Sequence, residues 1–265
     1  MSAATDKPVA IILAAGKGTR MKGDLPKVVH PVGGRPMVCP IVDACLEAGC
    51  RRIIAIVGYK QELVREALKG YRQVEYAVQD QQLGTGHAVL SARTTLGNDG
   101  DDIFVLGGDG PLIRSATLKT VLEKHRTSKA AATLATSIID DPTGYGRIVR
   151  DAAGKFREIV EHKNATPEQK AICEVNPSYY CFQRRDLFDA LSKVQRNPAS
   201  GEYYLTDTLA LLLKEGKHVE VVPAVPPEDV LSINTPEELA VVDRIYRQRA
   251  QGTAKATNSG GGAAR

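Results

Sequence analysis

The first half of the chain alternates short apolar runs with amphipathic stretches. The apolar runs, which predict buried strands, are residues 9–13, 52–57, 74–78 and 103–106. The amphipathic stretches, which predict helices, are residues 36–46, 61–69 and the stretch after Gly86. Strands without polar alternation, separated by helical periods, are typical of a parallel sheet with helices on both faces. The pattern therefore predicts an α/β fold with a mostly parallel sheet, whose ligands bind at the carboxyl ends of the strands.

The second half of the chain is less regular. Short alternating segments at residues 147–149, 156–160 and 173–182 predict hairpins appended to the sheet. Helices are expected at about 184–193 and 205–215.

The two ends of the chain differ from the middle. Thr235-Pro236-Glu237-Glu238 has the spacing of a capping box and predicts a last helix that ends near Arg249. Small and polar residues dominate from Ala250 onward, so residues 251–265 are expected to be a disordered tail. Residues 1–7 are expected to be a flexible N-terminus, which leaves residues 8–250 as one domain.

The composition, 43% hydrophobic and 25% charged over 265 residues, is that of an ordinary globular protein. Five of the 35 basic residues and none of the 31 acidic residues follow Asp243, so the rest of the chain is close to neutral. It lacks the broad basic face that duplex nucleic acid requires. No apolar run approaches the ~20 residues of a membrane span, and no secretory signal is visible. The five cysteines form no CxxC pair, which indicates neither a disulfide framework nor a zinc site and favours a cytoplasmic location.

The most informative segment is the Gly-rich loop after the first predicted strand, Leu13-Ala14-Ala15-Gly16-Lys17-Gly18-Thr19-Arg20-Met21. Such a loop presents backbone N–H groups to an anion. It is not a dinucleotide-binding fingerprint, because G-x-G-x-x-G fails at Met21, and it is not a P-loop. Arg20 and, shortly after, Lys27 add a guanidinium and an ammonium, which suit a polyphosphate better than a single carboxylate.

The loop followed by Leu25-Pro26-Lys27 resembles the signature of the sugar-1-phosphate nucleotidyltransferases. Further matching strings lie at residues 79–88, 108–112, 141–148, 159–163 and 201–207. Over residues 8–250 they resemble the uridyltransferase domain of the bacterial bifunctional N-acetylglucosamine-1-phosphate uridyltransferase/glucosamine-1-phosphate acetyltransferase. The resemblance implies a Rossmann-like fold of the sugar nucleotidyltransferase type, with the hairpins forming the sugar side of the site. It also implies Mg²⁺-dependent transfer of UMP from UTP to N-acetylglucosamine 1-phosphate, which gives pyrophosphate and UDP-N-acetylglucosamine, a cell-wall precursor.

The resemblance assigns roles to individual residues. Arg20 and Lys27 are expected to neutralise the polyphosphate during catalysis, and Asp109 and Asn234 to hold Mg²⁺. The residues expected to line the sugar are Gly146, Glu161, Asn176 and Thr206. The residues expected to bind the nucleotide are Leu13, Ala14, Gly16, Lys17, Gly18, Thr19, Gln79, Gln82, Gly84 and Thr85.

Several of these positions also suit their roles chemically. Gln79 ends a predicted strand, where its carboxamide can donate to and accept from the uracil imide. Gly84-Thr85-Gly86 opens a predicted helix and can offer N–H groups to the nucleotide. Asp109 follows an apolar strand at the rim of the sheet, where Mg²⁺ can bridge carboxylate and phosphate oxygens. The sugar phosphate is already an anionic nucleophile, so the reaction needs positioning and charge neutralisation rather than a general base.

The chain departs from the family pattern near the expected sugar site. Gly107 stands where the family usually has a larger residue, Gly110 replaces Val or a similar residue, and Pro177-Ser178-Tyr179 follows the position of the usual Asn. These departures leave open transfer to another sugar 1-phosphate, such as glucose 1-phosphate. A non-catalytic regulatory subunit with the same fold is the second alternative.

The family's C-terminal acetyltransferase β-helix has no counterpart in these 265 residues, because no hexapeptide repeat is found. No acetyl transfer to glucosamine 1-phosphate is therefore expected. The sequence leaves the oligomeric state open.

Overall fold

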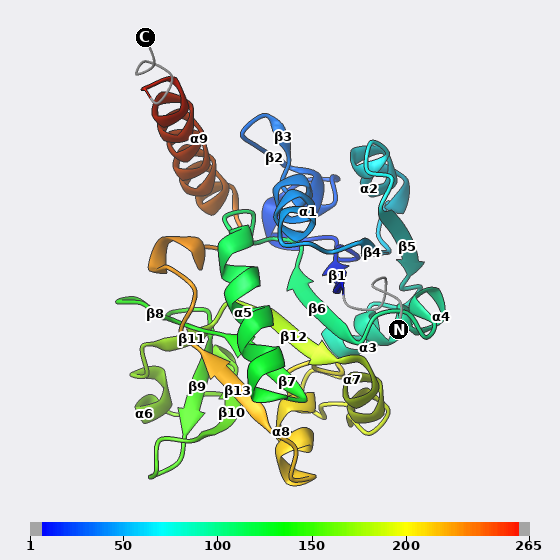
Figure 1. Ribbon diagram of the computed structural model, residues 1–265, viewed down its shortest axis with the longest axis vertical. Coiled ribbons are helices and arrows are strands. Elements are labelled where there is room, and N and C mark those ends of the chain that lie inside the picture. Colours follow the sequence, from blue (N-terminus) through cyan, green and yellow to red (C-terminus); the bar gives the residue numbers. More distant parts are fainter. Residues whose placement is uncertain (1–6, 260–265) are drawn as a thin grey trace.

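The computed structural model describes residues 7–259. Its centre is a seven-stranded sheet with the order β13-β7-β12-β6-β1-β4-β5 (Figure 1). The strands are β1 (Val9–Leu13), β4 (Arg52–Val57), β5 (Val74–Val78), β6 (Asp102–Gly107), β7 (Ala132–Ala135), β12 (Tyr179–Gln183) and β13 (Val219–Val222). Pairing is parallel except at β12, which runs antiparallel between β6 and β7. The predicted α/β fold with a mostly parallel sheet is confirmed.

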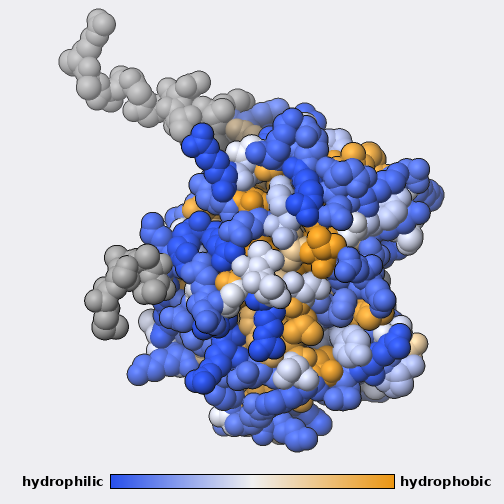
Figure 2. Space-filling model, turned by 90° about the vertical axis from the view of Figure 1, so that its right-hand side faces the viewer, coloured by the Kyte–Doolittle hydropathy of each residue, from blue (hydrophilic) through white to orange (hydrophobic). Residues whose placement is uncertain are grey.

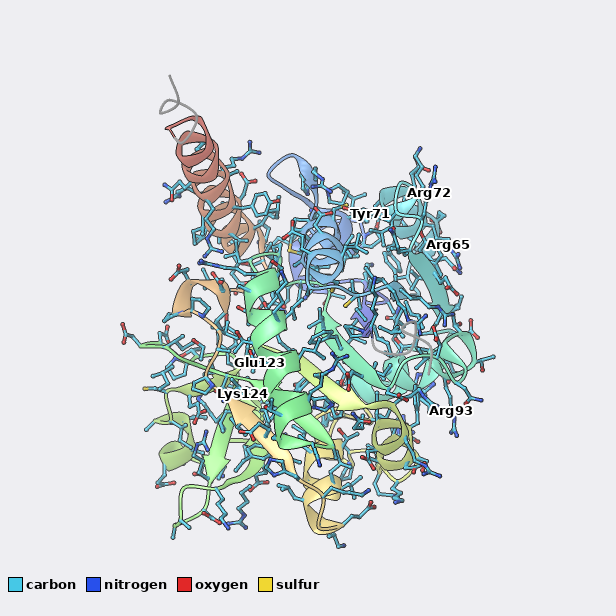
Figure 3. The ribbon with its side chains drawn as sticks, viewed as in Figure 1. Arg65, Tyr71, Arg72, Arg93, Glu123 and Lys124 are labelled. Atoms are coloured by element: carbon cyan, nitrogen blue, oxygen red, sulfur yellow. The ribbon has the colours of Figure 1, made fainter. Side chains whose placement is uncertain are left out.

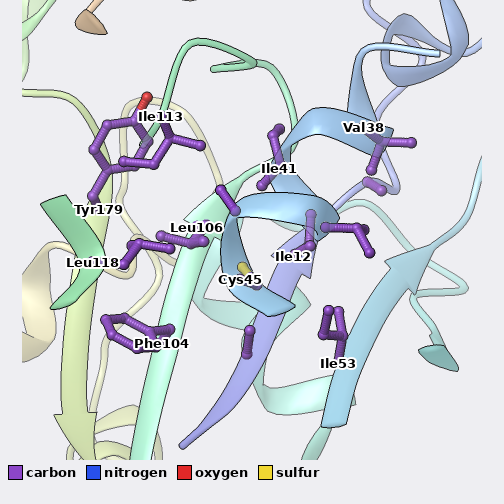
Figure 4. Close-up of a cluster of buried hydrophobic side chains, with 14 of the residues drawn as sticks. Ile12, Val38, Ile41, Cys45, Ile53, Phe104, Leu106, Ile113, Leu118 and Tyr179 are labelled. Carbon is purple, nitrogen blue, oxygen red and sulfur yellow. The ribbon is translucent and has the colours of Figure 1, made fainter. Parts of the chain in front are cut away.

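The inner strands β1, β4 and β6 are largely apolar because both of their faces are buried, whereas the edge strand β5 is partly exposed. Along β1, Ala10 and Ile12 belong to one hydrophobic core, whereas Val9 and Ile11 belong to a second core on the opposite face. Figure 4 shows part of the first core, where Ile12 lies beside Ile41. Burial on both faces explains why polar alternation is missing from these strands.

Helices cover both faces of the sheet (Figure 1). The first core receives side chains from α1 (Val38–Glu47), α2 (Gln61–Leu68) and α5 (Ser115–Ser128). The second core receives them from α3 (Thr85–Ser91), α4 (Arg93–Leu96), α7 (Arg184–Leu191) and α8 (Asp207–Lys214). The polar sides of the helices face outward, as at Glu123 and Lys124 of α5 (Figure 3). Helix α1 begins later than predicted because Arg35 and Pro36 form β3 (Arg35–Pro36), which pairs with β2 (Pro31–Val32).

A second sheet of four antiparallel strands has the order β10-β9-β11-β8. Its strands are β8 (Ser137–Ile138), β9 (Gly146–Arg150), β10 (Phe156–Val160) and β11 (Glu174–Asn176), and the short helix α6 (Pro167–Lys170) lies between β10 and β11 in the chain. The hairpin prediction is confirmed for β9 and β10, but segment 173–182 is divided between β11 here and β12 in the main sheet. The division falls at Pro177, which has no N–H to donate, and at Ser178, whose φ of 65° turns the chain.

The last helix, α9 (Pro236–Ser259), starts at the predicted capping box but continues beyond the expected end near Arg249. Residues 251–259, expected to belong to a disordered tail, are helical. Once a helix is nucleated, each added residue of moderate propensity gains a hydrogen bond at little cost. The remaining parts of the expected flexible ends, residues 1–6 and 260–265, lie outside the described residues.

The surface on the right-hand side of Figure 1 is mostly hydrophilic, with apolar residues gathered along its middle (Figure 2). Large exposed apolar side chains come from separate parts of the chain: Leu25, Val78, Ile138 and Val241. Among the described helices, none combines the length and the apolar character that a membrane span needs.

Candidate active site

The Gly-rich loop and Asp109 meet because β1 and β6 are neighbours. The chain runs from β1 to β4 and β5 on one side and returns to β6 on the other, so the strand order reverses between β1 and β6. Such a switch point opens a crevice at the carboxyl ends of the strands. Gly108 N donates to Leu13 O over 3.0 Å, and a Cβ at Gly108 would lie 2.5 Å from that oxygen. A glycine is needed here for the two loops to touch.

Four side chains assigned by sequence to catalysis and metal binding converge in this crevice. Lys27 Nζ lies 2.5 Å from Asp109 Oδ2 and 3.0 Å from Asn234 Oδ1. Arg20 Nη2 donates to the same Asn234 Oδ1 over 2.9 Å. Lys27 is 82 positions from Asp109 and 207 from Asn234 in sequence, so only the fold brings them together.

Local turns place the two cations. Arg20 lies in the 3₁₀ turn η1 (Thr19–Met21), and Lys27 begins the turn η2 (Lys27–Val29). Gly18, with a φ of 71°, precedes η1, and a Cβ there would lie 2.5 Å from Lys27 Cβ. Gly18 therefore allows the loop to pack directly on Lys27.

The predicted capping box also places Asn234. Glu238 Oε2 accepts from Thr235 N over 3.0 Å, and Glu238 N donates to Thr235 Oγ1 over 3.2 Å. The same Oε2 accepts from Asn234 N over 2.5 Å, while Ile233 N donates to the carbonyl oxygen of Asp109 over 2.9 Å. The sequence predicted the cap, but it did not identify Glu238 as a support for Asn234.

A cavity of about 340 Å³ lies between the Gly-rich loop, the end of β5 and the start of α3. Its wall includes most of the predicted nucleotide-binding residues: Leu13, Gly16, Gln79, Gln82, Gly84 and Thr85. The predicted residues outside this wall are Ala14, Lys17, Gly18 and Thr19. Ala14 N donates to Ile56 O over 2.9 Å, and Lys17 Nζ lies 5.3 Å from the ring centroid of Tyr59, so the fold itself uses these polar groups.

The turn at the start of α3 is hydrogen-bonded to the segment before α8. A Cβ at Gly84, whose φ is 99°, would lie 2.6 Å from Tyr203 O. Gly86 N donates to that oxygen over 2.8 Å, and Thr85 Oγ1 accepts from Leu205 N over 3.0 Å. The Gly86 N–H, which the sequence offered to the nucleotide, is therefore already paired.

Gln79 presents one defined atom to the cavity between the Gly-rich loop and α3. Its Nε2 lies 3.1 Å from Gly84 O and 3.0 Å from His87 Nδ1. A carbonyl only accepts, so the amide nitrogen must face Gly84, and His87 Nδ1 accepts the second amide hydrogen. Both hydrogens are used, and among the described residues none donates to Oε1. Sequence reasoning gave His87 no role, although it lies within the matching string at 79–88.

A second cavity, of about 240 Å³, lies between three of the converging residues, Arg20, Asp109 and Asn234, and the second sheet. Three of the predicted sugar residues line it: Gly146, Glu161 and Asn176. Thr206 lies outside its wall, at the residue before α8. The half-buried Glu161 carboxylate has no hydrogen-bond partner among the described residues. Burial raises the pKa of this carboxyl, and nearby Lys163 opposes the shift only in part.

The Asn176 side chain is held at both ends. Its Nδ2 donates to Tyr180 Oη over 2.7 Å, and its Oδ1 accepts from Ser178 N over 3.1 Å. Gly146 lies opposite Asn176 in the ladder, where a Cβ would lie 2.8 Å from Ile159 Cγ2. The glycine keeps this wall of the cavity open.

Two departures from the family pattern are linked to the Asp109 loop. A Cβ at Gly107 would lie 2.8 Å from Asp109 Oδ1. A Cβ at Gly110 would lie 2.5 Å from the hydroxyl oxygen of Tyr179, a fully buried residue that is itself a departure. Tyr179 therefore takes the space that a side chain at position 110 would fill.

The oxygens of Asp109 and Asn234 fit a hard divalent cation. One carboxylate oxygen and one amide oxygen already converge on a single cationic group, the Lys27 ammonium. Mg²⁺ takes few protein ligands and completes its shell with water and phosphate oxygens. No cluster of three or more His, Cys, Asp or Glu side chains that could hold a metal occurs among the described residues, so the donor pair suits an ion shared with a phosphorylated substrate.

This fold and this crevice define a nucleotidyltransferase. Residues 9–225 match the model of the nucleotidyl transferase family, and the chain belongs to that family. Among curated relatives, the bifunctional protein GlmU of Geobacillus thermodenitrificans is 47% identical over 243 residues, which cover 92% of this chain and 52% of GlmU. GlmU of Geobacter metallireducens is 44% identical, and the match covers 91% of this chain and 50% of that GlmU. GlmU of Desulfotalea psychrophila is 44% identical, and the match covers 92% of this chain and 72% of that GlmU. The chain thus spans about half the length of the first two relatives.

Solved structures share the fold. UDP-glucose pyrophosphorylase complexed with UDP-glucose superposes with a TM-score of 0.74 at 19% identity and covers 92% of this chain and 99% of its own. The apo form of UDP-glucose pyrophosphorylase gives a TM-score of 0.71 at 18% identity, with coverage of 92% and 99%. At these identities the similarity shows the architecture alone.

Proposed function

We propose that this chain transfers UMP from UTP to N-acetylglucosamine 1-phosphate with Mg²⁺, giving UDP-N-acetylglucosamine and pyrophosphate. The observation that carries the proposal is the convergence of Arg20, Lys27, Asp109 and Asn234 between two cavities. The 47% identity to GlmU supports the choice of substrates.

The nucleotide-side cavity would select the base through Gln79. Its Oε1 is the atom left to accept a hydrogen bond, which matches the N3–H of uracil. Cytosine carries an acceptor at that position and would leave the buried carboxamide unpaired. Leu13, Gly16, Gln82 and the turn at Gly84 and Thr85 would enclose the rest of the nucleoside.

Arg20 and Lys27 would bind the triphosphate and neutralise the charge that accumulates on it. Asp109 and Asn234 would hold Mg²⁺, which when bound supplies positive charge to the phosphate oxygens. The sugar phosphate attacks as an anion, so these residues need to align it and to stabilise charge rather than to remove a proton.

The second cavity would hold the sugar. The unpaired carboxylate of Glu161 can accept from a hydroxyl or an acetamido N–H, and Asn176 has spare hydrogen-bonding capacity beside it. Gly146 keeps the wall open. Thr206 would contact the sugar only from the start of α8, outside the cavity wall.

Pyrophosphate release by the purified chain tests this function. UTP and Mg²⁺ are incubated with N-acetylglucosamine 1-phosphate, glucose 1-phosphate or galactosamine 1-phosphate in turn, with Asp109→Asn as the blank. We expect the fastest release with N-acetylglucosamine 1-phosphate. Faster release with glucose 1-phosphate would change the sugar assignment. No release with any sugar, from a protein that melts normally, would favour the regulatory subunit.

We assign this activity to residues 8–250 and to the cytoplasm, with UTP and a sugar 1-phosphate as the partners. The cytoplasmic assignment rests on five cysteines that form no disulfide. The near-neutral body of the chain supports the absence of a nucleic-acid partner.

A further inference from the structure

The two cations of the crevice occupy the oxygens that the proposed function assigns to the metal. Asn234 Oδ1 accepts from Lys27 Nζ over 3.0 Å and from Arg20 Nη2 over 2.9 Å. An amide oxygen has two lone pairs, so both are used. Asp109 Oδ2 is engaged as well, by Lys27 Nζ at 2.5 Å.

We propose that Lys27 and Arg20 close the metal site of the free protein and open it when a polyphosphate draws them away. The metal and the nucleotide then bind as a coupled pair. This inference rests on the proposed function, because it takes Asp109 and Asn234 as the metal ligands and UTP as the polyphosphate.

Charge explains the coupling. In the free protein a divalent ion held by Asp109 and Asn234 would lie against both Lys27 and Arg20, and Asp109 is the one carboxylate among the described residues with which either cation forms an ion pair. A triphosphate supplies several anionic oxygens, which a guanidinium and an ammonium bind more strongly than a neutral amide oxygen. The Arg20 side chain is exposed and can move to them without breaking the core. Once both cations have moved, the carboxylate and the amide oxygen are free for the metal.

Linkage makes the inference quantitative. If UTP raises the affinity for the metal by some factor, the metal must raise the affinity for UTP by the same factor. Both affinities can be measured without turnover, because UTP alone lacks the second substrate.

The test is a titration of the full chain with Mn²⁺, in which free Mn²⁺ is followed by electron paramagnetic resonance with and without UTP. Wild type should bind Mn²⁺ weakly alone and more tightly with UTP. Lys27→Met should bind Mn²⁺ about tenfold more tightly without UTP, because a charge-assisted contact no longer competes. Its affinity for Mn²⁺ at saturating UTP should change little, so the gain in affinity caused by UTP is smaller than in wild type. Arg20→Met, which frees only Asn234 Oδ1, should show a smaller increase.

Lys22→Met is the matched control, because it removes the same charge from the same loop. Lys22 is exposed and makes no hydrogen bond or ion pair with Asp109 or Asn234. It should leave Mn²⁺ binding close to wild type, and the melting temperatures of all variants should match.

Two results with Lys27→Met would overturn the inference. In one, Lys27→Met binds Mn²⁺ no more tightly than wild type without UTP. In the other, its affinity rises equally with and without UTP, which is the signature of a general charge effect. Asp109→Asn must also weaken Mn²⁺ binding; unchanged binding would move the metal site and end the proposal. Failure of the pyrophosphate assay would instead refute the proposed function, and the Mn²⁺ comparison without UTP would still report on Lys27.

Discussion

The two sides of the crevice, proposed above to bind the nucleotide and the sugar, satisfy their polar groups differently. On the nucleotide side, Gln79 uses both amide hydrogens on Gly84 and His87, and Gln82 Nε2 donates to Ala15 O over 2.8 Å. On the sugar side, Glu161 is half-buried with no hydrogen-bond partner among the described residues. The nucleotide side is therefore preorganised around one unpaired acceptor, Gln79 Oε1, whereas the sugar side has an unpaired carboxylate, Glu161, that can bind a ligand.

The difference follows from the strands that carry each side. The loops of the nucleotide side leave parallel strands of the main sheet, of which β1 and β4 are buried on both faces. The sugar side is built on the smaller antiparallel sheet, and the chain leaves it through Ser178, a non-glycine residue with a φ of 65°.

Removing the carboxylate that both sides share should have the largest effect. Asp109→Asn keeps the shape of the side chain but removes its charge, and kcat for pyrophosphate release should fall by about 10³-fold or more. A thermal melt that matches wild type excludes misfolding. Near wild-type turnover at low Mg²⁺ would show that Asp109 is not the metal ligand.

Removing the hydrogen-bond acceptor of the nucleotide side should lower the preference for UTP over CTP. Gln79→Leu removes the Oε1 acceptor and should lower kcat/KM for UTP by about 10- to 100-fold, with little change for CTP. The KM for the sugar phosphate should stay near wild type. If the preference for UTP over CTP survives, another group reads the base.

Gly110→Val tests whether Gly110 and Tyr179 share the same space beside the Asp109 loop. The new Cβ would meet the buried Tyr179 hydroxyl, so the free energy of unfolding should fall by about 1–3 kcal/mol. Gly110→Val combined with Tyr179→Ile should recover a large part of that loss, since the obstructing ring is gone. Denaturant titration of both variants and of Tyr179→Ile alone measures the coupling. Additive losses would mean that the two positions do not share space.

Glu161→Gln breaks only the sugar side. A neutral amide replaces a charged acceptor, so KM for the sugar phosphate should rise about tenfold while KM for UTP is unchanged. Measurement of both KM values separates the two sides, and an equal rise in both would contradict the assignment.

The same variant has a pH signature. Burial raises the pKa of Glu161 in the folded state above its unfolded value near 4.3, so the native protein holds the proton more tightly. The stability of wild type relative to Glu161→Gln should therefore be highest below pH 4. It should fall as the pH rises through the folded pKa and then stay constant. Thermal melts at pH 4 and pH 8 measure this, and a constant difference would contradict the shift.

Ser178→Gly, on the sugar side, should have the smallest effect of these substitutions, and the effect should be on stability. Glycine relieves the left-handed φ at this position, while its backbone N–H can still donate to Asn176. After the greater freedom of glycine in the unfolded chain is included, a gain of up to about 1 kcal/mol is expected from chemical denaturation. A loss of stability would mean that the serine side chain contributes more than the strain costs.

Much of the scaffold could be predicted from the sequence alone. Strands buried on both faces lack polar alternation, so β1, β4 and β6 were visible as apolar runs, and the edge strand β5 was predicted although it contains the exposed Glu75. The cap at Thr235 was predicted because its interactions span only three positions. The Gly-rich loop was predicted for the same reason, because its turns and its backbone N–H groups depend on neighbouring residues in the sequence. It forms one half of the crevice.

Other features depended on the tertiary structure. An apolar run predicts a buried strand, but it does not predict which strands pair with it or in which direction. The antiparallel insertion of β12 between β6 and β7 was therefore missed. Packing between separate elements produces the hydrogen bond between Gln79 and His87. It also produces the close approach of Gly110 and Tyr179. The contact of Lys27 with Asn234, 207 positions away, exists because the fold places the ends of distant segments in one crevice. Local patterns determined the elements, and long-range packing decided which of their polar groups remain available for chemistry.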